Sequence, residues 1–232
     1  MTVLSSLSLR PLLLLSFLFF AGSFISQAQH LNSFLWEHSF DLGFDSSEKW
    51  SHSFGVANRA LLSEHFDGEQ VSDFQNEHLE LNHFTKYKTG ATTSVSLGLR
   101  YRFRETFDES RYDELRFVEQ FNIKHANSSI GLGHRFRVEQ RFRNVETIHR
   151  FRYQIGGSRD LGEDFALGLS TEALLSVEKD TKPSLEQRIL LELTNTSLDN
   201  IEFSLGLDYE MENYNIELEN QFYLLTGVSF DL

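Results

Sequence analysis

The sequence predicts an all-β fold: a single antiparallel transmembrane β-barrel of ten or twelve strands, with twelve favoured. Three features lead to this prediction. The chain opens with a segment typical of exported proteins. Apolar and polar residues then alternate one by one through most of the chain, as they do in a strand with one apolar and one polar face. Finally, no stretch after residue 28 is apolar for long enough to form a spanning helix.

The first 28 residues have the organisation of a secretory signal peptide. A short polar segment carrying Arg10 precedes an apolar run from Pro11 to Ile25, and Ser26-Gln27-Ala28 places small residues at both recognition positions of a cleavage site. An uncleaved anchor is the alternative, but a spanning helix needs about 20 apolar residues and this run is shorter. We therefore expect a signal peptide over residues 1–28 and a barrel domain over residues 29–232 that begins at Gln29.

Composition excludes several other classes of protein. The formal net charge of −13 makes nucleic acid a poor partner. The chain has no cysteine, so an exported protein of this kind must be held together without disulfides, for which a closed hydrogen-bonded barrel would suffice. It has no phosphate loop, nucleotide-binding glycine motif or His-x3-His pair. We therefore expect no cofactor and no metal.

The segment from Thr93 to Arg104 shows the alternation without interruption. A helix would mix its two faces around the circumference, so the pattern indicates a strand. Eleven segments share this period, although 77–88 alternates weakly, and single-chain bacterial barrels have even strand numbers, so we expect ten or twelve strands. The segments are 34–44, 50–59, 77–88, 93–104, 115–123, 130–142, 150–155, 165–177, 188–193, 201–211 and 221–232.

One residue conflicts with this pattern. Glu119 lies among Leu115, Phe117, Phe121 and Ile123 on the apolar face of its segment. A carboxylate facing lipid costs free energy that depends on its depth in the bilayer. Glu119 is therefore re-aimed by a bulge, close to a membrane interface, or in a different register.

A soluble lipocalin-like lipid binder would show the same alternation. Most of the segments are longer than the roughly 5–6 residues of globular strands and suit the roughly 9–11 residues of a tilted membrane strand. Their polar faces are rich in arginine, which suits a hydrated lumen better than a soluble core. Aromatic residues at or near segment ends would form a girdle at the membrane interfaces: Trp36, Trp50, Tyr87, Tyr101, Tyr153 and Tyr209.

The connections divide between two ends of the barrel. If the C-terminus is periplasmic, so are the turns at Asp45, Thr89, Ala126, 156–164 and 194–200. The longer connections 62–73 and 106–113 would then be extracellular.

The runs from His134 to Phe142 and from His149 to Tyr153 resemble the signature of a family of bacterial outer-membrane barrels known as domain of unknown function 2490. The resemblance extends over most of the mature chain, although the specific motif covers about two strands. It implies a barrel in the outer membrane, with membrane lipids and the barrel-assembly machinery as partners, and it brings no catalytic residues. Outer-membrane proteins usually end on an aromatic residue, whereas this chain ends Phe230-Asp231-Leu232.

The strongest candidate site is a ladder of charges on the lumen side of the strands. Arginines and acids concentrate on different strands, so the two sets could meet across a narrow lumen. They would then form either a salt-bridged plug that seals a structural or interaction barrel, which is favoured, or a narrow charge-selective pore or transporter lined by arginine. The candidate residues are Arg100, Arg102, Arg104, Arg135, Arg137, Glu139, Arg141, Arg150, Arg152, Glu172, Arg188 and Glu192.

A lipid-face acyl hydrolase is a more distant alternative. His38, His52, His134 and His149 fall on apolar faces, but none is followed two residues later by serine, and no orienting acid accompanies them. We therefore expect no catalytic residues and a protein that is not an enzyme.

Overall fold

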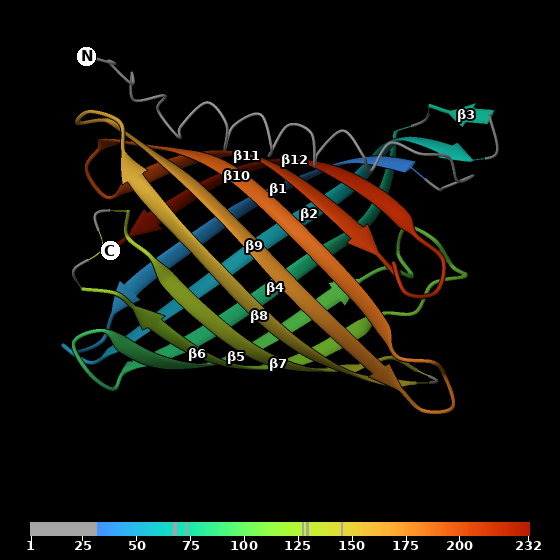
Figure 1. The fold of residues 1–232 in the computed structure, drawn as a ribbon, viewed down its shortest axis with the longest axis horizontal. Coiled ribbons are helices and arrows are strands. Elements are labelled where there is room, and N and C mark those ends of the chain that lie inside the picture. The colour runs from blue at the N-terminus through green and yellow to red at the C-terminus, as the bar shows by residue number, and fades with distance from the viewer. Residues whose placement is uncertain (1–31, 67–68, 73, 127, 129, 145) are drawn as a thin grey trace, which may run out of the picture.

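The computed structural model describes residues 32–66, 69–72, 74–126, 128, 130–144 and 146–232 (Figure 1). The predicted signal peptide lies outside these residues. The described part of the chain contains no helix that is long and apolar enough to cross a bilayer. The strands are β1 (Asn32–Asp45), β2 (Trp50–Phe66), β3 (Glu69–Val71), β4 (Gln75–Lys88), β5 (Thr93–Phe103), β6 (Glu114–Lys124), β7 (Gly133–Phe142), β8 (Thr147–Asp160), β9 (Phe165–Glu178), β10 (Ser184–Leu198), β11 (Ile201–Glu212) and β12 (Glu219–Asp231).

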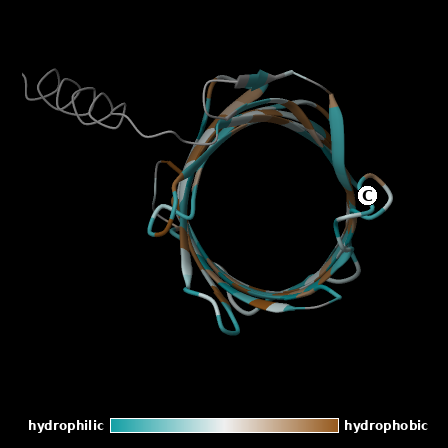
Figure 2. Cartoon of the chain, turned by 90° about the vertical axis from the view of Figure 1, so that its right-hand side faces the viewer, coloured by the Kyte–Doolittle hydropathy of each residue, from teal (hydrophilic) through white to brown (hydrophobic). Residues whose placement is uncertain are grey.

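Eleven of these strands close into a barrel, which appears as a ring when viewed along its axis (Figure 2). Each barrel strand pairs with the next barrel strand along the chain, so that β2 pairs with β4, and β1 pairs with both β2 and β12. The short β3 pairs only with the end of β2 and lies outside the ring. All the pairings are antiparallel except that between β1 and β12, which is parallel from Asn32↔Asn220 to Gly43↔Asp231.

The prediction of ten or twelve strands is wrong. Each of the eleven alternating segments corresponds to one barrel strand, so the even number expected of single-chain bacterial barrels does not hold here. An even number follows only if the first and last strands run in opposite directions. Here β1 and β12 run the same way and close the barrel through a parallel ladder, which the side-chain alternation does not reveal.

The two faces of the sheet differ as the alternation predicts. Outward side chains are mostly apolar, and Leu97 and Leu207 are 67% and 61% exposed. Inward side chains are largely charged or small, and Glu114 and Glu139 are both 0% exposed. A soluble protein has the opposite arrangement, with most of its apolar side chains in the interior and most of its charged side chains at the surface.

Glu119 lies on the outer face. It pairs in register with Leu97 on β5 and Val138 on β7, with no bulge in either ladder, and its side chain is exposed near the middle of β6. Of the explanations that the sequence left open, neither a bulge nor a different register applies.

The barrel has a turn end and a loop end. The turn end carries the connections 46–49, 89–92, 125–132, 161–164 and 199–200 together with the C-terminus, as the sequence predicts. Gly156 and Thr194 themselves lie inside β8 and β10, because both strands continue further than their alternation indicates. The loop end carries β3 and the longer connections, including 104–113.

Asp113 organises the 104–113 connection. Its carboxylate accepts hydrogen bonds from the backbone amides of Arg104 and Glu105 and from the Tyr101 hydroxyl. Slight burial raises the pKa of Asp113, but these three donors outweigh it and hold that pKa below its ordinary value. The connection is thus tied to the rim of the barrel.

The predicted aromatic girdle is formed only in part. Trp50 and Tyr87 lie at the ends of β2 and β4 and contact each other, with ring centroids 4.7 Å apart. Trp36 and Tyr153 lie further inside their strands.

Candidate functional site: the lumen arginine network

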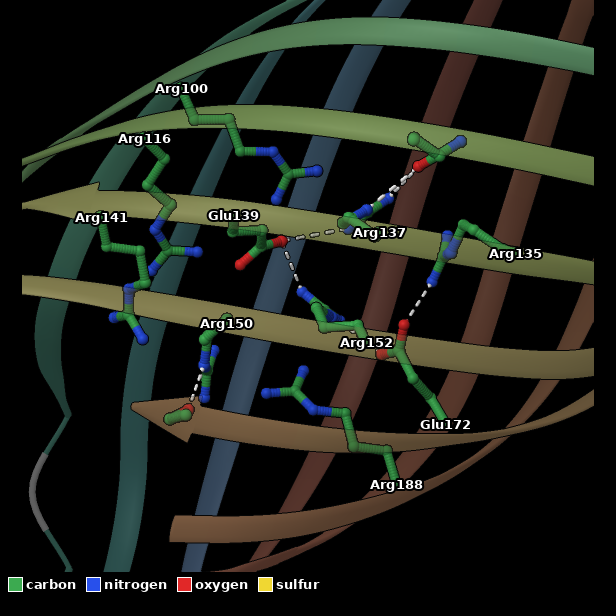
Figure 3. Close-up of polar contacts among 12 residues, drawn as sticks. Arg100, Arg116, Arg135, Arg137, Glu139, Arg141, Arg150, Arg152, Glu172 and Arg188 are labelled. Atoms are coloured by element: carbon green, nitrogen blue, oxygen red, sulfur yellow. Dashed lines mark hydrogen bonds and ion pairs between the residues drawn. The ribbon is translucent and has the colours of Figure 1, made fainter. Parts of the chain in front are cut away.

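The lumen side of β5–β8 carries a dense group of arginines. Strict alternation places them inward on successive strands, and register places those of neighbouring strands side by side, as in the pairs Arg100↔Arg116 and Arg137↔Arg152. Figure 3 shows these side chains extending from several strands toward one another and toward Glu139 and Glu172. Like charges at this spacing repel, so the arrangement requires carboxylates among the guanidinium groups.

Every arginine that the described barrel strands place in the lumen forms an ion pair with glutamate. Ten arginines share seven glutamates, and all the pairs join residues of one strand, of neighbouring strands or of strands with one other between them. The arginines are Arg59, Arg100, Arg102, Arg116, Arg135, Arg137, Arg141, Arg150, Arg152 and Arg188, and the glutamates are Glu37, Glu80, Glu114, Glu139, Glu172, Glu186 and Glu210.

Glu114 is the most heavily shared carboxylate. It contacts Arg116 on its own strand, Arg141 on β7 at 2.8 Å and Arg143 just beyond β7 at 2.6 Å. Hydrogen bonds between ionised partners are stronger than those between neutral groups. Glu114 therefore holds the loop-end side of the arginine group together.

Three arginines are surplus to this pairing. Arg100 shares Glu80 with Arg102, while Arg135 and Arg137 share Glu172 and Glu139 with Arg152. Each of the three glutamates would keep an arginine partner if these residues were removed. Arg152, by contrast, bridges Glu139 and Glu172 and is the common partner of both.

The surplus arginines also separate the spaces inside the barrel. A polar cavity of about 890 Å³ opens toward the loop end, and two cavities of about 660 Å³ each lie toward the turn end. All three surplus arginines line the loop-end cavity. Arg100 and Arg137 also line the first turn-end cavity, and Arg135 also lines the second, so the three side chains lie between the cavities of the two ends. The turn-end cavities are bordered mainly by small or neutral side chains, including Ser94, Gly156, Ser170, Gly43 and Ser53.

The sequence identified most of this network. Ten of its twelve candidate residues belong to the ion-paired group. Arg104 instead follows the end of β5 and forms no ion pair among the described residues. Glu192 lies opposite Gly168 and Gly206, lines a turn-end cavity, and likewise takes part in no ion pair there.

Seven members of the network are not among the candidates: Arg59, Arg116, Glu37, Glu80, Glu114, Glu186 and Glu210. Glu80 lies on the weakly alternating segment and Glu114 is the first residue of β6, where the end of a strand is hardest to place. Arg116 lies on the polar side of a segment whose register was in doubt because of Glu119. The ion pairs join side chains along the same wall of the barrel. The sequence led us to expect arginines on one side to meet acids on the other side across the lumen, and this does not occur among the described residues.

Among the described residues, His52 is not part of a complete serine–histidine–acid triad. His52 contacts two hydroxyls that the sequence spacing did not reveal, Ser46 at 3.2 Å and Thr85 at 3.1 Å. No carboxylate orients the ring, and the backbone amides of Ser46 and Ser47 are bound to the carbonyl of Trp50 rather than free to stabilise an oxyanion.

The profile of a family described as protein of unknown function, DUF2490, matches residues 36–221. The chain belongs to the DUF2490 family. This match confirms the resemblance seen in the two arginine-rich runs on β7 and β8, which both fall within DUF2490. No curated protein matches the sequence.

The solved structures similar to this DUF2490 chain include two porins. One is the NanC porin, with 14% sequence identity and a TM-score of 0.46, covering 84% of this chain and 99% of that chain. The other is an anion-selective porin from Comamonas acidovorans, with 15% identity and a TM-score of 0.36, covering 77% of this chain and 57% of that chain.

Proposed function

We propose that this protein is a non-enzymatic outer-membrane barrel whose lumen is a narrow, arginine-lined pathway for small anions. In this proposal residues 1–28 are removed on export, the mature chain begins at Gln29, and the barrel-assembly machinery inserts it among outer-membrane lipids. The observation that carries the proposal is the layer of Arg100, Arg135 and Arg137, which lies between the cavities of the two ends.

The outer wall supports the placement in a membrane. Most of its outward side chains are large and apolar, and soluble monomers rarely expose contiguous apolar patches larger than a few hundred Å². A bilayer covers such a wall, while the closed ladder satisfies the backbone hydrogen bonds within it. The short turns and the C-terminus would be periplasmic and the longer loops extracellular.

The charge of the arginine layer supports the choice of solute. The surplus arginines leave a local excess of positive charge on the β5–β8 side of the lumen, in a protein that is acidic overall. Rings of arginine or lysine select anions in pores, and guanidinium groups bind carboxylate and phosphate groups well.

The test is to refold the mature chain into detergent, insert it into planar bilayers and measure the reversal potential in a KCl gradient. We expect discrete conductance steps with a preference for chloride over potassium. Replacing Arg100, Arg135 and Arg137 together with glutamine should lower the ratio of chloride to potassium permeability about tenfold, which corresponds to about 1.4 kcal/mol. The variant should keep its heat-modifiable migration on gels, because each affected glutamate retains a second arginine.

A matched control removes the same charge outside the lumen. Lys49, Arg159 and Lys179 are exposed residues at the two rims, and their joint replacement with glutamine should leave the permeability ratio unchanged. An equal effect of both triple variants would mean that overall charge, not the arginine layer, sets selectivity. Failure of the wild-type chain to insert would overturn the membrane placement itself.

A sealed structural barrel is the second candidate. It is favoured by the complete pairing of the lumen arginines, because a fully paired network can fill a small barrel. Folded, inserted protein that conducts no current would establish this reading and contradict the pathway.

A further inference from the structure

Two histidines meet on the outer wall at the turn end of the barrel. His125 follows the last residue of β6 and His134 lies near the start of β7. The turn between them is closed by a hydrogen bond from the amide of His125 to the carbonyl of Leu132, 2.9 Å long. The hairpin thus brings the two rings together although they are nine positions apart, a spacing that matches no metal-binding motif in the sequence.

The two imidazoles face each other through the same nitrogen. The Nε2 atoms of His125 and His134 are 2.9 Å apart. On the other side of its ring, His134 Nδ1 lies 2.9 Å from the hydroxyl oxygen of Tyr153 on β8. If Nδ1–H donates to Tyr153, the Nε2 of His134 carries a lone pair directed toward His125, which is the form that binds a metal.

We propose that His125 and His134 together bind a divalent transition-metal ion, with Cu²⁺ bound most tightly. With metal–nitrogen bonds of about 2.0–2.1 Å, two ligands at 90° lie about 2.9 Å apart and two at the tetrahedral angle about 3.3 Å apart. In the structure this separation is that of a hydrogen bond, which His125 Nε2–H donates when the Nε2 of His134 carries the lone pair. It also equals the spacing of neighbouring positions in a tetragonal site, the geometry that Cu²⁺ and Ni²⁺ prefer, so a metal ion can take the place of the shared proton. His125 is exposed, so its ring has room to turn out of this hydrogen bond until both lone pairs point at one ion.

The site uses two protein ligands and water. Among the described residues no three of His, Cys, Asp or Glu gather closely enough to hold a metal ion. Tyr153 acts from behind His134, where its hydroxyl fixes the tautomer and orientation of the ligand. This proposal does not depend on whether the lumen conducts ions.

A second histidine pair on the outer wall provides the control. His52 and His83 stack face to face, with centroids 5.9 Å apart and an interplanar angle of 3°. The two nitrogens of His52 contact the hydroxyls of Ser46 and Thr85. This pair has the same residue types but no two nitrogens that converge, so it should bind no metal.

The experiment is a calorimetric titration of Cu²⁺ into the full-length mature protein, folded in detergent and purified without a histidine tag. Electron paramagnetic resonance of the copper would count the coordinated nitrogens. We expect one bound ion with two imidazole ligands. His125→Ala and His134→Ala should each weaken binding at least tenfold, Tyr153→Phe should weaken it about tenfold through loss of the orienting hydroxyl, and His52→Ala should leave it unchanged.

Several results would overturn the proposal. One is an absence of Cu²⁺ binding to the wild type at millimolar concentration, and another is equal binding by wild type and His125→Ala. Loss of binding in His52→Ala alone would place the metal elsewhere. His125 is exposed and follows the end of β6, so its replacement leaves the barrel ladder intact, and heat-modifiable migration of the variant checks this directly.

Discussion

The lumen has two unlike walls. The wall formed by β5–β8 contributes eight arginines against only two glutamates of its own that enter the ion pairs, Glu114 and Glu139. The wall formed by β10–β12, β1 and β2 is acidic. Its inward residues include Glu186, Glu192, Glu202, Asp208, Glu210, Glu212, Asp231, Glu37 and Asp41, while Arg59 and Arg188 are the arginines that its described strands turn into the lumen.

The difference shows how a barrel of this size distributes charge. Inward side chains of adjacent strands lie within reach of one another because strands are about 4.7–4.9 Å apart, whereas the opposite wall is many strands away around the ring. The ion pairs therefore form along the wall, and each wall keeps an excess of its own sign. Opposite excesses on facing walls produce an electric field across the lumen.

The largest effect should come from removing the anion at the centre of the arginine wall. Glu114→Gln leaves Arg116 and Arg141 without their closest carboxylate in a fully buried position. Removing one partner of a buried ion pair typically costs about 3–5 kcal/mol. We expect a fall of this size in the free energy of unfolding, measured by urea titration with the gel shift as readout.

The control for Glu114→Gln is the same substitution on the other wall. Glu192→Gln also removes one lumen carboxylate, but Glu192 forms no ion pair among the described residues and should change stability by less than about 0.5 kcal/mol. Equal losses for the two variants would contradict the idea that the arginine wall depends on its few acids.

A smaller loss of stability is expected at the parallel seam, where β1 and β12 pair and close the barrel within the acidic wall. Arg59 on β2 reaches past β1 to Tyr223 on β12, with a 3.1 Å hydrogen bond to the hydroxyl, and it lies over the ring at 4.7 Å. Tyr223→Phe keeps the ring contact and removes the hydrogen bond to a charged group, so we expect a loss of about 1–2 kcal/mol in urea unfolding.

Tyr209→Phe is the matched control for the seam. The hydroxyl of Tyr209 bonds Asn220 at 2.8 Å across an antiparallel pair on the outer face, with no charged partner. Its loss should cost about 0.5–1 kcal/mol. If Tyr209→Phe proved the more damaging change, the seam would not rely on its arginine.

The fold was predictable from residue alternation because the outer wall and the lumen of a barrel carry side chains of opposite polarity at successive positions. That period predicts the eleven segments and the inward position of the arginines. It also predicts that the short turns lie together at one end of the barrel. The direction of β1 relative to β12 does not, since a parallel and an antiparallel seam place the same side chains on the same faces. Strand ends such as those of β8 and β10 were underestimated because polar residues at the rim weaken the alternation.

The members of the site were predictable but their pairing was not. Alternation shows that Arg137 faces inward, whereas its partner depends on register, which places Gln120 and Arg152 directly opposite it. The meeting of His52 with Ser46 and Thr85 likewise needs three elements at once. Contacts of this kind depend on hairpin register, and the period of the side chains does not determine register alone.

The smallest effect should come from the unpaired acids of β11. Asp208 and Glu212 flank Glu210 and form no ion pair among the described residues, whereas Glu210 is bound to Arg188 at 2.6 Å. Replacing both with Asn and Gln should raise the ratio of chloride to potassium permeability about twofold, equivalent to about 0.4 kcal/mol, without loss of stability. Glu210→Gln should instead destabilise the barrel, since Arg188 would keep only Glu186 at 3.7 Å. A double variant that lowers the chloride preference would mean that anions pass along the acidic wall, so that the two walls do not divide the lumen by sign.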